Sequence, residues 1–112
     1  MGQNVWVKSG RTYNLLGTGV TVTGAGSSVY KDSPYATFQA TVVGTGAVTA
    51  TVTIEVSNDN TYWCATPMGT ITLSGTTSNS DGFTTTAPWK YVRANVTAVS
   101  GTGATVNVTM GV

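Results

Sequence analysis

The sequence predicts an all-β fold: a two-sheet, antiparallel, jelly-roll-like β-sandwich with little or no helix. Three observations support this. Apolar and polar residues alternate along most of the chain, short glycine-containing segments separate the alternating runs, and no stretch sustains the helical period of about 3.6 residues. A chain of 112 residues is long enough for one domain with one small core.

The alternation locates the strands. The clearest run spans residues 47–57, where threonines separate the apolar positions Val48, Ala50, Val52, Ile54 and Val56. Similar patterns predict long strands over 35–43, 89–99 and 104–111, and short strands over 62–64, 70–74 and 83–86. One side of each long strand is therefore expected to face a core, while the other side carries mostly threonine.

The connections between strands are short and rich in glycine. Gly44-Thr45-Gly46 predicts a β-hairpin that pairs strand 35–43 with strand 47–57, and Gly101-Thr102-Gly103 predicts a second tight connection. The segments 41–47 and 97–104 resemble each other, which indicates repeated turn chemistry and not a duplicated domain. Residues 75–82 are polar and are expected to form a loop.

The chain divides into two parts within a single domain. Residues 1–34 contain short β-like pieces and the glycine-serine connection 24–28. They are expected to form either edge strands or an arm that becomes ordered on a partner, whereas residues 35–112 form the sandwich core.

Charge is scarce, and threonine is abundant. Only nine residues are charged, 23 are threonine, and the net charge is +1. A nucleic-acid-binding protein needs a basic surface to displace counterions from phosphates, so no nucleic-acid partner is expected. A nearly neutral surface protects a free monomer poorly against association, which favours a component of an assembly.

The residues that usually carry catalysis are few. The chain has no histidine, a single cysteine, Cys64, and four carboxylates. We therefore expect no enzymatic activity, no cofactor, no metal site and no intrachain disulfide. Asn58-Asp59-Asn60 lacks the spacing of a calcium loop and is typical of a turn. We see neither a signal peptide nor a transmembrane run, so we expect synthesis in a cytoplasm and no membrane partner.

Six aromatic residues are candidates for an interface, because aromatic side chains are enriched at binding hot spots. Four lie in or near the N-terminal segment, and two lie at strand ends: Trp6, Tyr13, Tyr30, Tyr35, Trp63 and Trp89. Trp63 and Trp89 fit two alternatives, an aromatic platform for a sugar or caps at the ends of the core.

Two segments carry a resemblance to a known class of proteins. Residues 52–63 (VTIEVSNDNTYW) and 87–98 (APWKYVRANVTA), with the closing residues 101–112, resemble small virion proteins of tailed bacteriophages. Within that class, the size and the all-β pattern look most like the capsid decoration proteins, also called cement or staple proteins, of short-tailed phages. The resemblance covers residues 36–112 and leaves the first 34 outside it.

The resemblance implies a non-enzymatic structural protein on the outer surface of the capsid, made in the bacterial host. It would bridge subunits of the major capsid protein and would associate with its own copies as a dimer or trimer. The alternative is a phage tail or fibre module, or a carbohydrate-binding β-sandwich.

Overall fold

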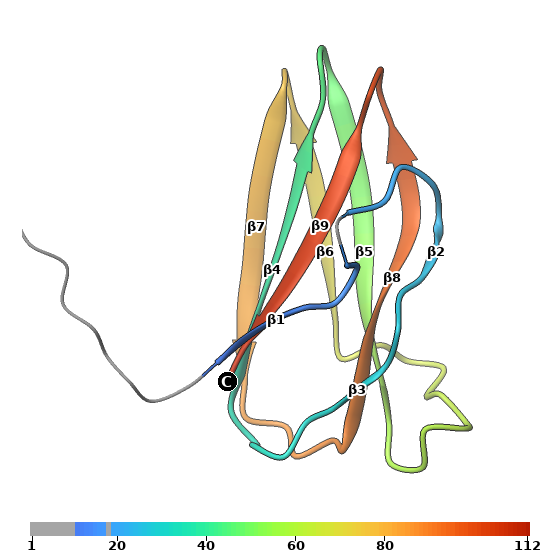
Figure 1. The fold of residues 1–112 in the computed structure, drawn as a ribbon, viewed down its shortest axis with the longest axis vertical. Coiled ribbons are helices and arrows are strands. Elements are labelled where there is room, and N and C mark those ends of the chain that lie inside the picture. Colours follow the sequence, from blue (N-terminus) through green and yellow to red (C-terminus); the bar gives the residue numbers. More distant parts are fainter. Residues whose placement is uncertain (1–10, 18) are drawn as a thin grey trace, which may run out of the picture.

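The computed structural model describes residues 11–17 and 19–112, and these residues form nine strands and no helix. The strands lie in two antiparallel sheets that pack face to face (Figure 1). The predicted all-β sandwich is therefore confirmed. Trp6 lies outside the described residues.

Each sheet combines strands that are distant in the sequence. Sheet A has the order β1-β9-β4-β7, which are Thr12–Asn14, Thr105–Gly111, Ala36–Val43 and Ser78–Thr85. Sheet B has the order β2-β8-β5-β6, which are Gly24–Ala25, Tyr91–Ser100, Val48–Ser57 and Gly69–Gly75. A further short strand, β3 (Val29–Tyr30), also pairs with β8.

The strand order is that of a jelly roll. Strands β2 and β3 pair with successive parts of β8, so they can be counted as one interrupted strand. Renumbered in this way, sheet A runs 1-8-3-6 and sheet B runs 2-7-4-5. This arrangement of two interlocked Greek keys is the jelly-roll topology.

The core lies between the sheets, where the apolar halves of the alternating runs meet. In β5 every even-numbered residue from Val48 to Val56 is buried, and the threonines between them are exposed or half-buried. The largest buried side chains include one aromatic residue and a set of aliphatic residues and one methionine: Phe38, Leu15, Ile54, Leu73, Met110, Val42, Val52, Val96 and Val106. Burying a side chain of this size contributes about 1.5–3 kcal/mol.

The prediction of a hairpin between 35–43 and 47–57 is wrong. Strand β4 pairs with β7 and β9, whereas β5 pairs with β6 and β8. The glycine segment at 44–46 is instead an arch that carries the chain from sheet A to sheet B. The segments 76–77 and 101–104 cross between the sheets in the same way, and all three arches lie at one end of the sandwich (Figure 1).

Two of these arches pack on each other, which explains their similar sequences. The amide and the hydroxyl of Thr45 both donate to the carbonyl of Thr102, each over 3.1 Å. Gly101 has a φ of 122°, in a region that favours glycine, and lies against the carbonyl of Ala47.

Two shorter predictions are also wrong. Residues 62–64 form no strand and belong to the long 58–68 connection between β5 and β6. Residues 78–82, predicted as loop, belong to β7, because a polar edge strand lacks the apolar alternation that identifies buried strands. The predicted strand at 70–74 is present, with Ile71 and Leu73 buried.

Residues 11–17 and 19–34 form edge strands in both sheets. β1 pairs with β9 in sheet A, while β2 and β3 pair with β8 in sheet B. Leu15 and Leu16, between β1 and β2, are buried in the common core.

We predict that Gly101→Ala destabilises the fold. A Cβ there would lie 2.5 Å from the carbonyl oxygen of Ala47, and the positive φ alone costs about 1–2 kcal/mol. Gly46→Ala is the matched control, because a Cβ at Gly46 meets no atom within 4 Å. Thermal unfolding followed by circular dichroism measures both. Equal stability of the two variants would contradict the role of the arch.

Candidate partner-binding surface

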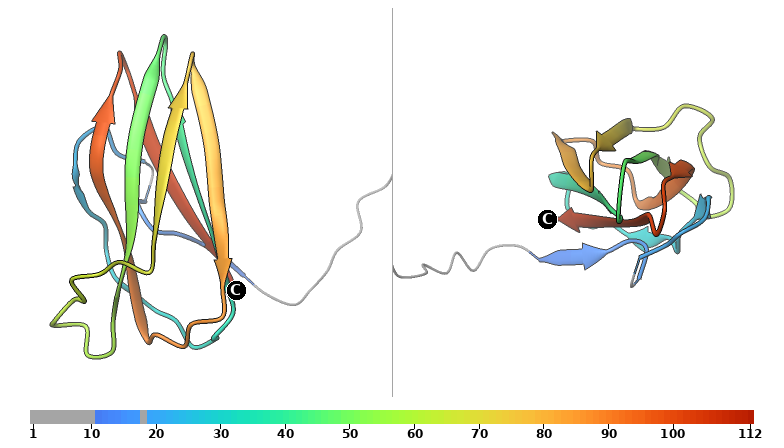
Figure 2. Two further views of the ribbon diagram at one scale, coloured as in Figure 1. Left: turned by 180° about the vertical axis from the view of Figure 1, so that it is seen from behind. Right: turned by 90° about the horizontal axis from the view of Figure 1, so that it is seen from above.

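Six aromatic residues belong to the segments at the end of the sandwich opposite the arches. The connections 31–35, 58–68 and 86–90 meet there with the first residues of β8 (Figures 1 and 2). We call this surface the aromatic end, and its members are Tyr30, Tyr35, Tyr62, Trp63, Trp89 and Tyr91. Four of them are sequence-predicted interface residues, and they come from the end of β3 and from the three connections.

Three tyrosines of the aromatic end are exposed. The exposed fraction is 80% for Tyr62, 66% for Tyr35 and 57% for Tyr30. Tyr30 also meets Tyr91 edge to face, with ring centroids 5.4 Å apart, because the two residues oppose each other across β3 and β8. Large exposed rings on ordered backbone are suited to bury area against a partner at little conformational cost.

Trp63 lies on the outer face of sheet B and is held by a charged pair. The guanidinium of Arg93 lies 4.2 Å from the Trp63 ring centroid, a cation–π contact. Arg93 Nε donates to Glu55 Oε1 over 2.6 Å, and Asn95 Nδ2 donates to Glu55 Oε2 over 3.1 Å. Glu55, Arg93 and Asn95 are on the outward side of β5 and β8, so strand pairing itself aligns the layer.

The 58–68 connection starts with a tight polar turn. The hydroxyl of Ser57 accepts the amide protons of Asp59 and Asn60 over 3.2 and 3.0 Å. Asp59 Oδ1 accepts those of Thr61 and Tyr62, both over 2.9 Å. The amides of Thr61 and Tyr62, together with the Ser57 hydroxyl, lower the pKa of the Asp59 carboxyl. The turn predicted for Asn58-Asp59-Asn60 therefore exists, and it presents Tyr62 to solvent.

Lys31 links two other connections of the aromatic end. Its buried ammonium group donates to the carbonyls of Ser33 over 2.8 Å and Ala87 over 2.7 Å. Burial, and to a smaller extent the charge of Lys90, lowers the pKa of Lys31. The amide of Lys90 donates to Asn58 Oδ1, which joins the third connection to the other two.

Trp89 has a different environment from Trp63. It is half-buried and packs against the core, next to Pro88 and Asn58 at a shallow pocket of about 280 Å³. It therefore caps this end of the core, whereas Trp63 lies over Arg93 outside the sheet. The two rings therefore lie in different environments, Trp89 against the core and Trp63 on the outer face of sheet B.

The remaining interface candidates lie elsewhere. Tyr13 of β1 is 41% exposed and lines a pocket with Tyr30 and Lys31, beside the aromatic end. Trp6 lies outside the described residues. Sequence reasoning missed Tyr62 and Tyr91; the turn before Tyr62 indicated exposure, but nothing in the sequence placed Tyr91 opposite Tyr30.

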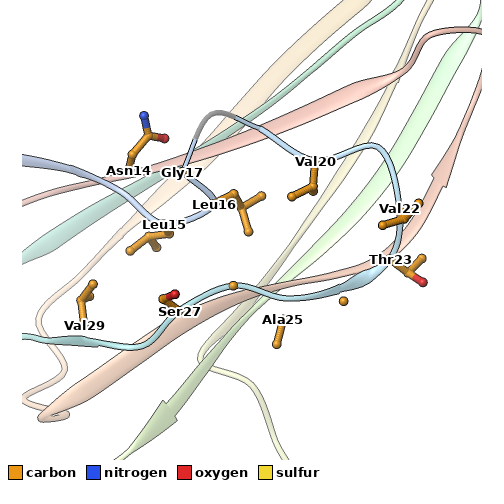
Figure 3. A pocket seen from close by; sticks show the side chains of 12 residues that line it. Asn14, Leu15, Leu16, Gly17, Val20, Val22, Thr23, Ala25, Ser27 and Val29 are labelled. Atoms are coloured by element: carbon orange, nitrogen blue, oxygen red, sulfur yellow. The ribbon is translucent and has the colours of Figure 1, made fainter.

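A larger pocket of about 500 Å³ lies where the chain crosses between the sheets (Figure 3). Its wall consists of backbone and small or apolar side chains, including Leu16, Val20 and Val22, and has no charged group. Within residues 11–17 and 19–112, no three His, Cys, Asp or Glu side chains are grouped to hold a metal ion. None of the described segments forms a helix long and apolar enough to cross a membrane.

Comparison with known proteins supports the fold. No protein-family model matches the chain, and no curated protein sequence matches it. The crystal structure of the SPBc2 prophage-derived protein YomS is similar, with a TM-score of 0.59 and 14% identical residues. The match covers 98% of this chain and 97% of that one. At this identity the likeness shows that the two chains share a fold.

We predict that acid loosens the 58–62 turn through Asp59. Folding lowers the pKa of Asp59. The stabilisation that its carboxylate gives the turn is therefore complete at pH values above the unfolded pKa of about 3.9, and it is lost as the pH falls through the folded pKa. The amide resonances of Thr61 and Tyr62 report this transition by NMR. In Asp59→Asn, whose side-chain oxygen still accepts but does not titrate, they stay constant; an equal shift in both proteins would contradict the assignment.

Proposed function

We propose that this chain is a phage virion protein without enzymatic activity, which decorates the capsid and stabilises it by bridging subunits of the major capsid protein. In this proposal it binds on the outer surface of the capsid and associates with its own copies. It is made in the cytoplasm of the bacterial host and needs neither cofactor nor membrane.

The observation that carries the proposal is the aromatic end. Three exposed tyrosines lie there: Tyr30 at the end of β3, and Tyr35 and Tyr62 on connections that Lys31, Asn58 and Asp59 tie together. Exposed aromatic rings on a well-ordered surface are the usual anchors of protein interfaces. The sequence segments that resemble phage virion proteins, 52–63 and 87–98, supply Tyr62, Trp63, Trp89 and Tyr91 of this surface.

Two further observations support a phage structural role. The structurally similar protein is prophage-derived, and the likeness extends over nearly the whole of both chains. Jelly rolls also recur in viral capsid proteins. In addition, the outward sides of β4, β5 and β9 carry mostly threonine, with Glu55 as their one charged residue, whereas charged residues normally keep a free surface soluble.

The mechanism requires only modest contacts. Each copy would add buried area across a joint between capsid subunits, and many copies would act together on one shell. Because linked contacts multiply their effect, a weak individual affinity is sufficient to resist the internal pressure of packaged DNA.

We predict that Tyr62→Ala and Tyr35→Ala each weaken binding to phage heads about tenfold, the loss of roughly 1.4 kcal/mol expected for an interface anchor. Co-sedimentation of purified protein with heads that lack it measures the affinity. Val22→Ala is the control, because Val22 is 68% exposed but far from the aromatic end in the chain crossing.

Heads without the protein are expected to release DNA at a lower temperature than complete heads. If the two kinds of head resist heat and osmotic shock equally, the stabilising role is wrong. If the protein does not bind heads but a glycan shifts its tryptophan emission, the carbohydrate-binding alternative is supported instead.

A further inference from the structure

The sandwich has two long edge strands on the same side, β6 in sheet B and β7 in sheet A. An edge strand presents unpaired backbone N–H and C=O groups, to which another strand can add. The two edges differ in how these groups are covered, and the difference indicates which edge is available.

The edge of β7 is blocked by its own side chains. The Gly44 amide donates to the Thr77 carbonyl, just before β7 begins. Hydrogen-bonded pairs alternate along two antiparallel strands, so the backbone groups of Asn79 and Asp81 bond to β4. The amides of Ser80 and Gly82 therefore point outward. Asn79 Oδ1 accepts the Ser80 amide over 2.9 Å, and Asp81 Oδ1 accepts the Gly82 amide over 2.8 Å. Asp81 also adds a charge to the edge, a recognised protection against strand addition.

The edge of β6 is open. The Gly26 amide donates to the Ala94 carbonyl, so the backbone groups of Ala94 face β2 and those of Arg93 and Asn95 face β5. Their partners in β5 are odd-numbered, which leaves the backbone groups of the even-numbered residues of β5 to bond to β6. Their partners in β6 include Ile71 and Leu73, which leaves the N–H and C=O groups of Thr70, Thr72 and Ser74 directed outward. Within the described part of the chain, no side chain hydrogen-bonds these three amides, and none of the three residues is charged.

The sequence of β6 is nearly symmetric about its centre. In Gly69-Thr70-Ile71-Thr72-Leu73-Ser74-Gly75, glycine matches glycine, Thr70 matches Ser74, and Ile71 matches Leu73. Two copies related by a two-fold axis through Thr72 therefore place like residues opposite each other. In this register the outward-directed residues of both strands meet, so the pairs Thr72–Thr72 and Thr70–Ser74 are the hydrogen-bonded ones.

We propose that β6 is the self-association edge of this protein and that its occupant is β6 of a second copy, antiparallel across a two-fold axis at Thr72. The dimer would join the two B sheets into one continuous sheet. Cross-strand pairs of Thr with Thr or Ser are favourable, and two-fold dimers are the commonest assemblies of identical chains. A partner with an unrelated strand would not require the near-symmetry that β6 shows.

The inference makes specific the self-association in the proposed function, and it does not depend on capsid binding. It is therefore tested on the purified protein without capsids. Failure of the dimer leaves capsid binding to be judged by co-sedimentation, and failure of capsid binding leaves the dimer intact.

The test places charge on the axis. Sedimentation over a micromolar-to-millimolar concentration series should show a monomer–dimer equilibrium for the unaltered chain. Thr72→Lys and Thr72→Glu each bring two like charges together and should weaken the dimer at least tenfold. An equimolar mixture of the two variants should restore the dimer as a heterodimer, which also shows that both variants are folded.

Thr84→Lys, on the other edge strand, is the matched control and should leave the dimer unchanged. Hydrogen exchange gives a second measurement: the amides of Thr70, Thr72 and Ser74 should become protected as concentration rises. A monomer at every concentration overturns the proposal. So does a dimer that Thr72→Lys leaves unaltered, or one that Thr84→Lys weakens equally.

Discussion

The structure depends on one constraint, that every arch must deliver the next strand to the opposite sheet with its apolar side facing inward. The arches at 44–46, 76–77 and 101–104 all make this crossing. A strand that entered one residue out of register would expose its whole apolar set, since side chains alternate with a period of two. Close packing at Gly101 and the bond from Thr45 to Thr102 fix that register where the chain turns.

The same constraint assigns roles to the two ends of the sandwich. The arch end needs small residues, because two arches pack on each other there, with Gly44 and Gly101 both against Val48. Larger side chains are accommodated at the opposite end, where longer connections leave room for rings. At that end the connections are held by hydrogen bonds between backbone groups and the side chains of Lys31 and Asp59. The aromatic rings lie partly outside the core.

The faces of the strands could be predicted from the sequence, but their partners could not. Alternation in 48–56 and 105–110 identified which side chains are buried, and the structure has them buried. The same Gly-Thr-Gly segment, however, fits a hairpin or an arch, because the choice depends on whether the next strand pairs with its neighbour or crosses the core. The sequence predicted only the end of β7, as a strand over 83–86; residues 78–82 were missed because they are polar and show no apolar alternation.

For the candidate partner-binding surface, the sequence predicted the residue types but not their common location. Aromatic residues at strand ends were recognised, yet only topology brings Tyr30, Trp63 and Trp89 to one end, through pairings such as Val29 with Val92. The cation–π contact of Trp63 depends on Arg93 lying beside Glu55 across two strands, a register that no local pattern contains.

The two proposed surfaces fit one arrangement. Strands paired antiparallel through β6 run in opposite directions, so the aromatic ends of the two copies would point away from each other. Strand β5 has ten residues, and at about 3.3 Å per residue the two ends would lie roughly 30 Å or more apart. A dimer lying along a surface would then present one aromatic end to each of two neighbouring subunits, which is the geometry that bridging requires. A single copy has one aromatic end. In this arrangement, pairing through the open edge of β6 would give a dimer with two aromatic ends, one for each neighbouring subunit.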